Sequence, residues 1–409
     1  MFAVDSLDSR YSWFRLAIAL VVATIGNVGI WSIVVILPAV QADFGIGRGG
    51  AAFPYTLTML GFALGNVVFG RIVDRFGIHL TLAGAALTSG TGYLLAAASP
   101  TLSVLAMAQF LIGLGTAAGF GPLIADTSLW FRRFRGLAVA IVASGNYLSG
   151  AIWPIILATP MAEQGWRPVM VILGVTIAGL IVPLAFLMRR RLGDSDLSTE
   201  AQRSRFSPQA TPFSPRLLMW LLALAGLSCC MAMAMPQVHI VALCVDLGYG
   251  PAVGAEMLSL MLLGGVVSRI VSGFIADRLG GVLTLLIGSI LQMVALFLYL
   301  PFDGMASLYA VSLVFGLAQG GIVPAYAIIV REYLPAREAG ARVGLVIMAT
   351  ILGMALGGWL SGVIYDLTGS YRLAFVNGIA WNALNIAIML TILFSSRFGK
   401  ARATGVAGA

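Results

Sequence analysis

The chain has 409 residues, of which 60% are hydrophobic and only 10% are charged. Soluble domains carry about 25% charged residues, so this composition excludes an ordinary soluble enzyme or binding domain and indicates an integral membrane protein. The formal net charge of +8 does not indicate nucleic-acid binding, because the basic residues follow the topology that we expect for the chain in a membrane.

Twelve apolar runs are each long enough to cross a bilayer, which takes roughly 17 to 25 residues of helix. The first run follows a polar N-terminal segment and is longer than the apolar core of a secretory signal, so we interpret it as a retained helix. In chain order the runs lie at about 14–39, 52–70, 79–98, 102–125, 137–158, 167–188, 216–243, 254–275, 282–300, 305–330, 343–365 and 372–395. The sequence therefore predicts an all-α membrane protein with twelve transmembrane helices.

The extended polar region at 189–215 separates the first six runs from the last six. Its Arg, Ser and Pro residues are typical of a flexible linker. We therefore expect an N-terminal six-helix bundle over 1–188, a cytoplasmic linker over 189–215 and a C-terminal six-helix bundle over 216–409.

The two halves carry the same sequence markers 203 positions apart. The pairs are Asp43-Phe44-Gly45 with Asp246-Leu247-Gly248, Gly70 and Asp74-Arg75 with Gly273 and Asp277-Arg278, and Gly113-Leu114 with Gly316-Leu317. Such a repeat is typical of transporters built from two similar bundles, in which the substrate site lies between the bundles near the middle of the membrane.

The positions of the basic residues predict the orientation in the membrane. Of the 24 Lys and Arg residues, 20 lie in segments on the same side as both termini, three lie on the opposite side, and one lies inside a run. The three are Arg48, Arg167 and Arg372. Because positive loops stay in the cytoplasm, we expect a multi-pass protein of the bacterial inner membrane with both termini cytoplasmic. We expect it to function as a monomer in the lipid bilayer.

The basic residue inside a run is Arg269, whose neighbours in the run 254–275 are mainly Leu, Met, Val and Ile. A charge at this depth costs roughly 2.5–3.5 kcal/mol on insertion scales, so such residues normally face a protein interior and meet a counter-charge. No Asp or Glu lies one helical turn away on either side. One interpretation is that Arg269 binds a carboxylate that arrives and leaves as substrate. The other is a structural arginine that donates to backbone carbonyls of neighbouring helices.

The repeated Gly-x3-Asp-Arg marker lies at the cytoplasmic ends of the second and eighth predicted helices. Glycine permits tight helix contact, and an aspartate beyond a helix end can cap the N-terminus of a neighbouring helix. We therefore expect a cytoplasmic gate that holds the inner face in one conformation and releases it in another; the alternative is a set of ordinary charged loop residues. The gate residues are Gly70, Asp74, Arg75, Gly273, Asp277 and Arg278.

These paired markers, the twelve helices and the central linker together resemble the major facilitator superfamily over the whole chain. Within that superfamily, the chain resembles the monocarboxylate transporter branch and its bacterial oxalate/formate antiporter relatives. The residues concerned are Arg269 four positions before Gly273, Trp130-Phe131-Arg132-Arg133-x-Arg135-Gly136, Gly165-Trp166-Arg167 and Pro236-Gln237-Val238-His239. The resemblance implies that Arg269 is a ligand of the substrate carboxylate.

The chain departs from that branch at two kinds of position. Gly265 stands four residues before the arginine, where some members have an acid. No lysine occurs in the run 343–365 or in the first run, where some members carry one. One fixed cation suits one negative charge, so we expect a monocarboxylate as the substrate.

Polar residues at mid-depth complete the predicted substrate site. The resemblance implies that helices 1, 4, 5, 7, 8, 10 and 11 line the cavity, and these helices contain Asn27, Asn146, Tyr147 and Gln319. Each residue could instead make a hydrogen bond between helices, which is worth well under about 1 kcal/mol on average.

Two further ionisable residues are candidates for proton binding or gating. His239 follows Pro236, and an imidazole titrates near neutral pH. His239 is therefore a candidate proton site or outer gate, or alternatively a neutral histidine bonded to a carbonyl that the proline frees. Asp126 precedes the arginine cluster 132–135, and we interpret it as a structural ion pair with that cluster or as a proton site.

The sequence contains no nucleotide-binding loop, metal cluster or nucleophile arrangement, so we expect neither an enzyme nor a cofactor. Cys229, Cys230 and Cys244 lie in one apolar run and predict no disulfide framework. The predicted function is secondary active transport of a small organic monocarboxylate by alternating access, in symport with protons. The alternatives are exchange against a counter-anion, efflux of drugs or metabolites, and a membrane sensor for a carboxylate.

Overall fold

The structure, a computed structural model, describes residues 7–190, 213–334 and 339–405, with the backbone alone for residues 339–341 and 396–405. Within these ranges every regular element is a helix. Twelve helical segments are long and apolar enough to cross a membrane, which confirms the predicted all-α class with twelve transmembrane helices. The predicted linker over 189–215 lies outside the described residues except at its two ends.

The first half of the chain forms six spans. The first span consists of α1 (Arg10–Gly26) and α2 (Val28–Phe44), and the fourth consists of α5 (Leu102–Thr116), the 3₁₀ turn η1 (Ala117–Gly119) and α6 (Gly121–Leu129). The other four are single helices, namely α3 (Arg48–Phe76), α4 (Ile78–Ala97), α7 (Arg135–Gln164) and α8 (Trp166–Leu187).

The second half also forms six spans. Its fourth span, the tenth of the chain, is divided into α13 (Met305–Gln319) and α14 (Ile322–Tyr333). The others are α10 (Pro215–Asp246), α11 (Pro251–Leu279), α12 (Gly281–Leu298), α15 (Ala339–Thr368) and α16 (Arg372–Gly405).

Three spans are interrupted near their middle, where the sequence analysis predicts continuous helices. In the tenth span, Pro324 has no N–H to donate to the carbonyl of Gly320, so the helical ladder stops between α13 and α14. Pro122 occupies the second position of α6 and divides the fourth span in the same way. In the first span Asn27 lies between α1 and α2, and its side-chain amide donates to the carbonyls of Ala23 (2.7 Å) and Gly119 (3.2 Å).

Glycines close equivalent turns in the two halves. Gly45 and Gly248 have φ angles of 60° and 81°, and Gly77 and Gly280 have φ angles of 81° and 80°. This left-handed backbone disfavours any residue with a side chain. Both pairs keep the offset of 203 positions, so the sequence repeat is also a repeat of local backbone structure.

Two of the closest helix crossings are also related by the offset of 203 positions. A Cβ atom added at Gly113 would lie 1.9 Å from the carbonyl oxygen of Thr58, and one added at Gly316 would lie 2.0 Å from that of Met261. Only glycine allows backbones to approach so closely. Helices α3 and α5 therefore cross in the first half as α11 and α13 do in the second.

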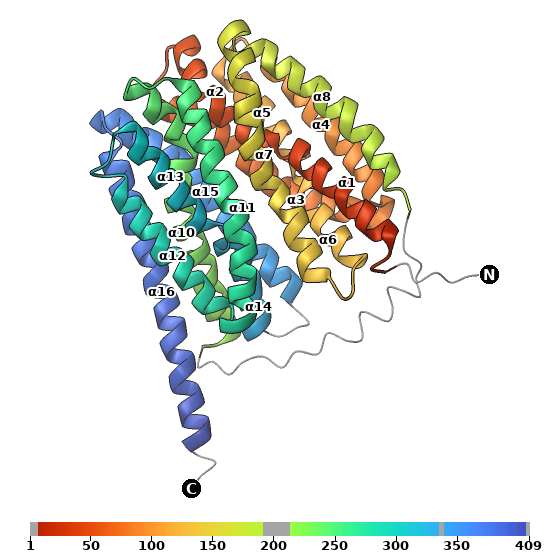
Figure 1. Ribbon diagram of the computed structural model, residues 1–409, viewed down its shortest axis with the longest axis vertical. Coiled ribbons are helices and arrows are strands. Elements are labelled where there is room, and N and C mark those ends of the chain that lie inside the picture. The colour runs from red at the N-terminus through yellow and green to blue at the C-terminus, as the bar shows by residue number, and fades with distance from the viewer. Residues whose placement is uncertain (1–6, 191–212, 335–338, 406–409) are drawn as a thin grey trace, which may run out of the picture.

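Figure 1 shows helices α1–α8 on one side of the molecule and α10–α16 on the other. The two groups touch through α7 with α11, α3 with α15 and α2 with α10. Helix α1 begins and α16 ends at one end of the molecule, which we call the termini face (Figure 1). At this face the ribbons of α6 and α14 stand apart, whereas the two groups meet toward the opposite face, where α2 ends and α3 begins.

Asp8 holds the start of the chain against the termini face. Its carboxylate accepts hydrogen bonds from the backbone N–H groups of Arg132 (3.2 Å), Arg133 (2.9 Å) and Phe134 (3.4 Å), immediately before α7. A negative charge is stabilised there because a helix N-terminus carries unpaired N–H donors and the positive end of the helix dipole. Part of the Trp130–Gly136 motif therefore fixes the N-terminal segment.

Candidate substrate site

Arg269 lies deep in the molecule, between the two halves. It follows Pro251, the first residue of α11, by 18 positions, which is about 27 Å of helix at 1.5 Å per residue. The residue is only 7% exposed. In the part of the chain that the structure describes, no carboxylate forms an ion pair with Arg269, and the ion pairs that are present involve other arginines.

One partner of Arg269 is the backbone at the break in the tenth span. Its Nε donates to the carbonyl of Gly320 at 3.3 Å, the carbonyl that Pro324 leaves without a helical donor. The N–H of the same glycine donates to the Oγ of Ser268 at 3.1 Å. Two consecutive residues of α11 thus satisfy both backbone groups at the break, as buried polar groups require.

The other partners of Arg269 belong to the first half. Its Nη1 donates to the carbonyl of Ala143 on α7. The ring of Tyr147, one helical turn further along α7, faces the guanidinium with 4.2 Å between Cζ and the ring centroid, within the range of a cation–π contact. Arg269 therefore connects the two bundles through a carbonyl and an aromatic face.

The glycine at position 265 makes room for this tyrosine. A Cβ atom on Gly265 would lie 3.2 Å from the nearest atom of the Tyr147 ring, which is tighter than most real contacts. An acidic side chain at this position, as found in some members of the resembling branch, would displace the ring. In this chain an aromatic face stands against the arginine where those members have an acid.

The position equivalent to Arg269 in the first half carries a neutral asparagine. Asn66 lies 203 positions before Arg269. Its Oδ1 accepts the N–H of Gly121 at 3.2 Å, and its Nδ2 donates to the carbonyl of Phe62. Both positions therefore satisfy backbone groups at or near a helix break, but only the second half places a cation there.

The other predicted substrate residues are distributed around this centre. Asn146, next to Tyr147, accepts the indole N–H of Trp31 at both its carbonyl (3.0 Å) and its Oδ1 (3.1 Å). Gln319 precedes Gly320 and accepts from the Nε2 of Gln237, while its own Nε2 has no partner among the described residues. Asn27 bonds within the first half. The structure thus brings Tyr147 against Arg269, and gives the three amides partners elsewhere.

His239 is fully buried, and both of its ring nitrogens have partners. Nε2 lies 2.7 Å from the carbonyl of Gly358 on α15, and Nδ1 lies 3.0 Å from the hydroxyl of Tyr371. A carbonyl only accepts, so Nε2 carries the proton and the tyrosine donates to Nδ1. The histidine does bond a backbone carbonyl, but it is not the carbonyl of Ala232, which Pro236 frees four residues earlier.

A charged cluster that was not predicted lies between the halves at the opposite face. Asp366 of α15 accepts the backbone N–H of Arg48 (2.7 Å) and Gly49 (2.8 Å) at the N-terminus of α3. The Arg48 side chain forms an ion pair with Asp246 at the end of α10 and lies over the ring of Tyr365, at 5.3 Å. The repeated Asp-x-Gly marker at Asp246 indicated this place, but not a partner from the other half.

Asp126 forms an ion pair with a different partner from the predicted one. Both Nε (3.2 Å) and Nη2 (2.8 Å) of Arg15 donate to Oδ2 of Asp126. Arg15 also donates from Nη1 to the carbonyl of Met188 at 2.6 Å. The pair is largely buried and joins α1 to α6, whereas the cluster at 132–135 lies past the end of α6 and does not reach this aspartate.

The predicted cytoplasmic gate makes no cross-bundle contact in this conformation. Asp74 and Asp277 are exposed, and neither has a hydrogen-bond partner among the described residues. Added Cβ atoms at Gly70 and Gly273 would meet nothing within 4 Å, so the expected tight helix contact is absent from these two positions. Instead, Glu332 of α14 caps α12 by accepting the N–H of Gly281 at 3.1 Å.

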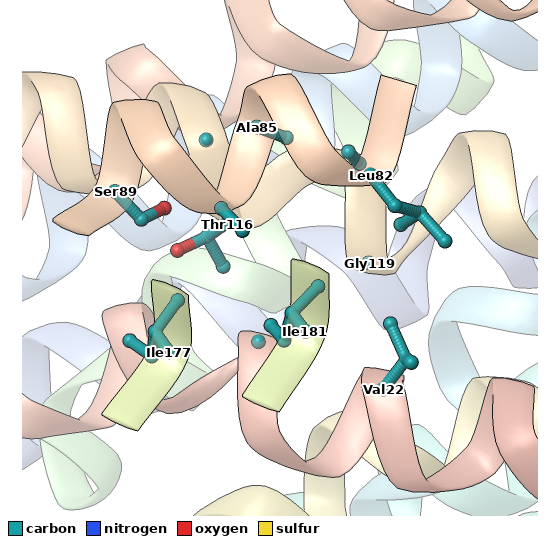
Figure 2. Close-up of a pocket in the computed structure, with 12 residues that line it drawn as sticks. Val22, Leu82, Ala85, Ser89, Thr116, Gly119, Ile177 and Ile181 are labelled. Atoms are coloured by element: carbon teal, nitrogen blue, oxygen red, sulfur yellow. The ribbon is translucent and has the colours of Figure 1, made fainter. Parts of the chain in front are cut away.

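A small cavity lies inside the first half, away from the centre at Arg269. Figure 2 shows its walls, which come from α1, α4, α8 and the broken fourth span and include Val22, Leu82, Ser89, Thr116, Gly119 and Ile181. Ser89 and Thr116 both donate to the carbonyl of Ile112, which leaves an almost apolar space. The equivalent positions in the second half carry the larger Gln292 and Gln319. We do not assign the substrate to this cavity, because it is internal to one bundle.

The described residues contain no group of three or more His, Cys, Asp and Glu placed to hold a metal ion. Cys229, Cys230 and Cys244 are buried free thiols, and the sulfurs of the first two lie 3.6 Å apart.

Two bundles of six spans that meet around a buried cation define a membrane transporter, and comparison with known proteins identifies its family. The family model of the Major Facilitator Superfamily matches residues 16–307 and 244–408. The chain therefore belongs to the Major Facilitator Superfamily.

Relatives within the family have several names. Monocarboxylate transporter 13 of Bos taurus is 26% identical over 333 residues, covering 80% of this chain and 76% of the relative. MFS-type transporter 1 of Ophiocordyceps sp. (strain BCC 1869) is 24% identical over 310 residues (75% and 68%), and Agnestins efflux protein AgnL12 of Paecilomyces divaricatus is 24% identical over 333 residues (80% and 74%).

The fold is also that of a solved transporter. The crystal structure of a bacterial homolog to the human lysosomal transporter Spinster, in an inward-facing and occupied conformation, superposes with a TM-score of 0.66. It covers 97% of this chain and 98% of its own, at 13% sequence identity. At this identity the likeness shows the fold alone.

Proposed function

We propose that the chain is a secondary active transporter that moves a small organic monocarboxylate across the bacterial inner membrane by alternating access, in symport with protons. The observation that carries this proposal is Arg269, a buried guanidinium between the two halves with no carboxylate partner among the described residues. A relative named monocarboxylate transporter supports the same substrate class.

The geometry of Arg269 suggests how the substrate would engage both halves. A guanidinium has five N–H donors, and carbonyl partners are present for Nε and Nη1. A carboxylate carries a full negative charge and can accept two parallel N–H bonds from the guanidinium, which a single carbonyl oxygen cannot. The substrate would therefore replace the carbonyl of Ala143 and change the contact that joins α7 to α11.

The orientation rests on the basic residues. Positive loops stay in the cytoplasm, so we propose that the termini face is cytoplasmic. In this conformation the bundles are then closed at the outer face by Arg48, Asp246 and Asp366, and the exposed Asp74 and Asp277 lie at the inner face. This arrangement fits a state in which the substrate exchanges with the cytoplasm.

We assign the proton to His239, a buried imidazole of the second half whose two ring nitrogens bond the carbonyl of Gly358 and the hydroxyl of Tyr371. Its position beside Tyr371 places it next to the outer cluster. Asp126 serves as a structural ion pair with Arg15 in the same scheme.

A second candidate is export of an acidic metabolite. It is favoured by the relative named Agnestins efflux protein, which matches this chain over the same length as the monocarboxylate transporter. A buried arginine is a poor site for cationic drugs, so on either candidate the cargo is an anion.

The proposal is tested by ligand binding to purified wild-type, Arg269→Lys and Arg269→Ala proteins. A bound ligand stabilises the folded state by about 2.7 kcal/mol at a hundred times its Kd. We expect lactate, pyruvate or an aromatic monocarboxylate to raise the melting temperature of the wild type, and cationic drugs to leave it unchanged. The lysine variant should bind the acid at least tenfold more weakly, because an ammonium does not match a carboxylate in the bidentate way that a guanidinium does.

Arg15→Lys is the matched control. It replaces another buried arginine, but one that already has the carboxylate of Asp126 as its partner. This variant should lose stability and keep its response to the acid. Equal binding of the acid by the wild type and by Arg269→Ala would remove Arg269 from the substrate site, whereas stabilisation by cations would overturn the choice of cargo.

A further inference from the structure

We propose that Arg48, Asp246 and Asp366 form the outer gate of the transport cycle, and that Asp246 exchanges Arg48 for Arg372 when this gate opens. The proposal concerns the movement of the two halves and does not depend on which molecule is carried.

The closed gate consists of contacts that separation of the halves must break. Asp366 supplies a carboxylate to two N–H groups at the N-terminus of α3, where an anion is favoured by unpaired donors and by the helix dipole. The Arg48 side chain is 6% exposed and its partner Asp246 is 26% exposed. Partly buried pairs of this kind are screened by salt much less than exposed ones.

Close backbone packing surrounds the same contacts. A Cβ atom on Gly362 would lie 2.8 Å from the carbonyl oxygen of Arg48, and one on Gly49 would lie 2.8 Å from a methyl carbon of Val363. Helices α3 and α15 therefore meet here without intervening side chains. The charged contacts and the packing belong to one surface and would be lost together.

The repeat shows what Asp246 does when Arg48 is absent. Its equivalent, Asp43, forms an ion pair inside the first half with Arg167, and it also accepts the indole N–H of Trp166 at 3.3 Å. The similar pair in the second half is Tyr371 and Arg372, which lie 205 rather than 203 positions later and begin the last span as Trp166 and Arg167 begin the sixth. Arg372 is exposed and has no ion-pair partner among the described residues.

The two equivalent aspartates, Asp246 and Asp43, differ in the arginines that can pair with them. The position equivalent to Arg48 in the second half, 203 residues later, is Pro251, so this position offers Asp43 no arginine from the other half. Asp246 has Arg48 in the closed state, and in its own half it interacts electrostatically with Tyr371, the residue before Arg372 at the start of α16. An exchange between Arg48 and Arg372 keeps the aspartate paired while the halves separate, which avoids leaving a partly buried charge uncompensated.

The gate is tested by labelling a cysteine placed beneath it. Val238 is fully buried on α10 and contacts Gly358, which in turn packs against Tyr55 of the first half. In a chain whose three native cysteines are replaced by alanine, Val238→Cys is exposed to a membrane-impermeant maleimide added from the outside. We expect Arg48→Ala or Asp246→Asn to raise the labelling rate at least tenfold, and Arg372→Ala to lower it at least threefold.

Two further variants make the outcome decisive. Arg167→Ala removes an ion pair that lies within the first half, and it should leave labelling within twofold of the parent. Arg48→Lys retains a cation and should restore labelling to within threefold of the parent, which distinguishes loss of the gate from a general loss of structure. Unchanged labelling in Arg48→Ala would refute the gate, and unchanged labelling in Arg372→Ala would refute the exchange. No substrate is present, so neither result depends on the identity of the cargo.

Discussion

Arg269 combines a structural and a functional requirement in one side chain. Its Nε satisfies the carbonyl that Pro324 leaves unpaired, as Asn66 satisfies the break in the first half. An asparagine would be sufficient for that structural task. The guanidinium of Arg269 instead places a charge at the contact between α7 and α11, although a neutral group there would cost less free energy. We attribute this charge to the anion that it is proposed to bind.

His239 provides a prediction about pH. We expect His239→Gln to flatten the pH dependence of substrate uptake into proteoliposomes while exchange of substrate across the membrane continues. Burial raises the pKa of Tyr371, which lies between the last two spans, so its hydroxyl stays protonated and donates to Nδ1 through the physiological range. In this pair the tyrosine therefore remains the donor, and a proton that binds the pair would bind the imidazole.

Tyr371→Phe is the control for this prediction. The donor to Nδ1 favours the neutral histidine, so its removal should move the midpoint of the pH profile upward and leave the dependence itself in place. Arg48 and Asp366 lie near the same imidazole and contribute opposing charges. A His239→Gln protein with the wild-type profile would assign the proton to another group.

Arg269 was predicted in the site because an intramembrane charge is rare, and Tyr147 because it is polar and lies on a helix that the resemblance implies lines the cavity. Their direct contact was not predicted. The carbonyls of Gly320 and Ala143 could not be predicted as partners, since every residue has a carbonyl. Asp126 was also placed beside the wrong arginines. Their proximity in sequence suggested a pair, but the helix ends before them and Arg15 reaches the aspartate from another helix.

At the scale of the elements, proline and glycine decide where helices break and where they cross. Pro122 and Pro324 were visible in the sequence, but a proline in a membrane helix does not by itself show whether the helix bends or divides. Here the freed carbonyl of Gly320 found a donor from α11, so the division is stable. The break at Asn27 has no proline and could not be predicted from composition.

The glycine crossings give a stability prediction. Gly113→Ala and Gly316→Ala should each destabilise the protein by about 1–3 kcal/mol, a typical cost of overpacking. The added Cβ atoms would lie 1.9 Å and 2.0 Å from backbone oxygens, which cannot move aside as a flexible side chain can. Thermal unfolding in detergent measures the loss, and the repeat implies that the two variants lose similar amounts.

Gly70→Ala and Gly273→Ala are the matched controls for these crossings. They lie at helical positions where a Cβ atom would meet nothing within 4 Å. Alanine is favoured over glycine in a helix by about 1 kcal/mol, so these variants should be as stable as the wild type or slightly more stable. A loss of stability in Gly70→Ala and Gly273→Ala would mean that the destabilisation by alanine is not caused by the close helix crossings at Gly113 and Gly316.

For the molecule as a whole, the spans and their number were predictable because each needs only a long apolar run. The contacts between the two halves could not be predicted from the sequence. The sequence repeat predicts two similar bundles, but the contacts between them depend on which state the protein occupies, and a repeat carries no information about state. Asp246 shows this, since its repeat partner Asp43 pairs inside one half while Asp246 pairs across the interface.

The proposed orientation gives a prediction for the whole molecule. Asp74→Cys should react with an impermeant maleimide in inside-out vesicles and not in intact cells, and Asp303→Cys should do the reverse. Both residues are exposed: Asp74 lies in the last turn of α3, and Asp303 lies in the connection between α12 and α13, where its carbonyl accepts from Tyr249 after the end of α10. The wild type serves as the blank, because its three cysteines are buried. The opposite labelling pattern would reverse the proposed orientation, and labelling of both variants from the same side would reject the topology.

The carbonyl of Gly320, which accepts from Arg269, also bears on the energetics of turnover. It belongs to the same bundle as Arg269, so it accompanies the guanidinium wherever that bundle moves. After the cargo has left, the cation still has an oxygen partner, and the vacant carrier can reset without transferring an unsolvated ion through hydrocarbon. A transporter that can return to its starting conformation without bound substrate does not need a second anion from the other side of the membrane. On the proposed function, we therefore expect net uptake of substrate with a proton rather than obligatory one-for-one exchange.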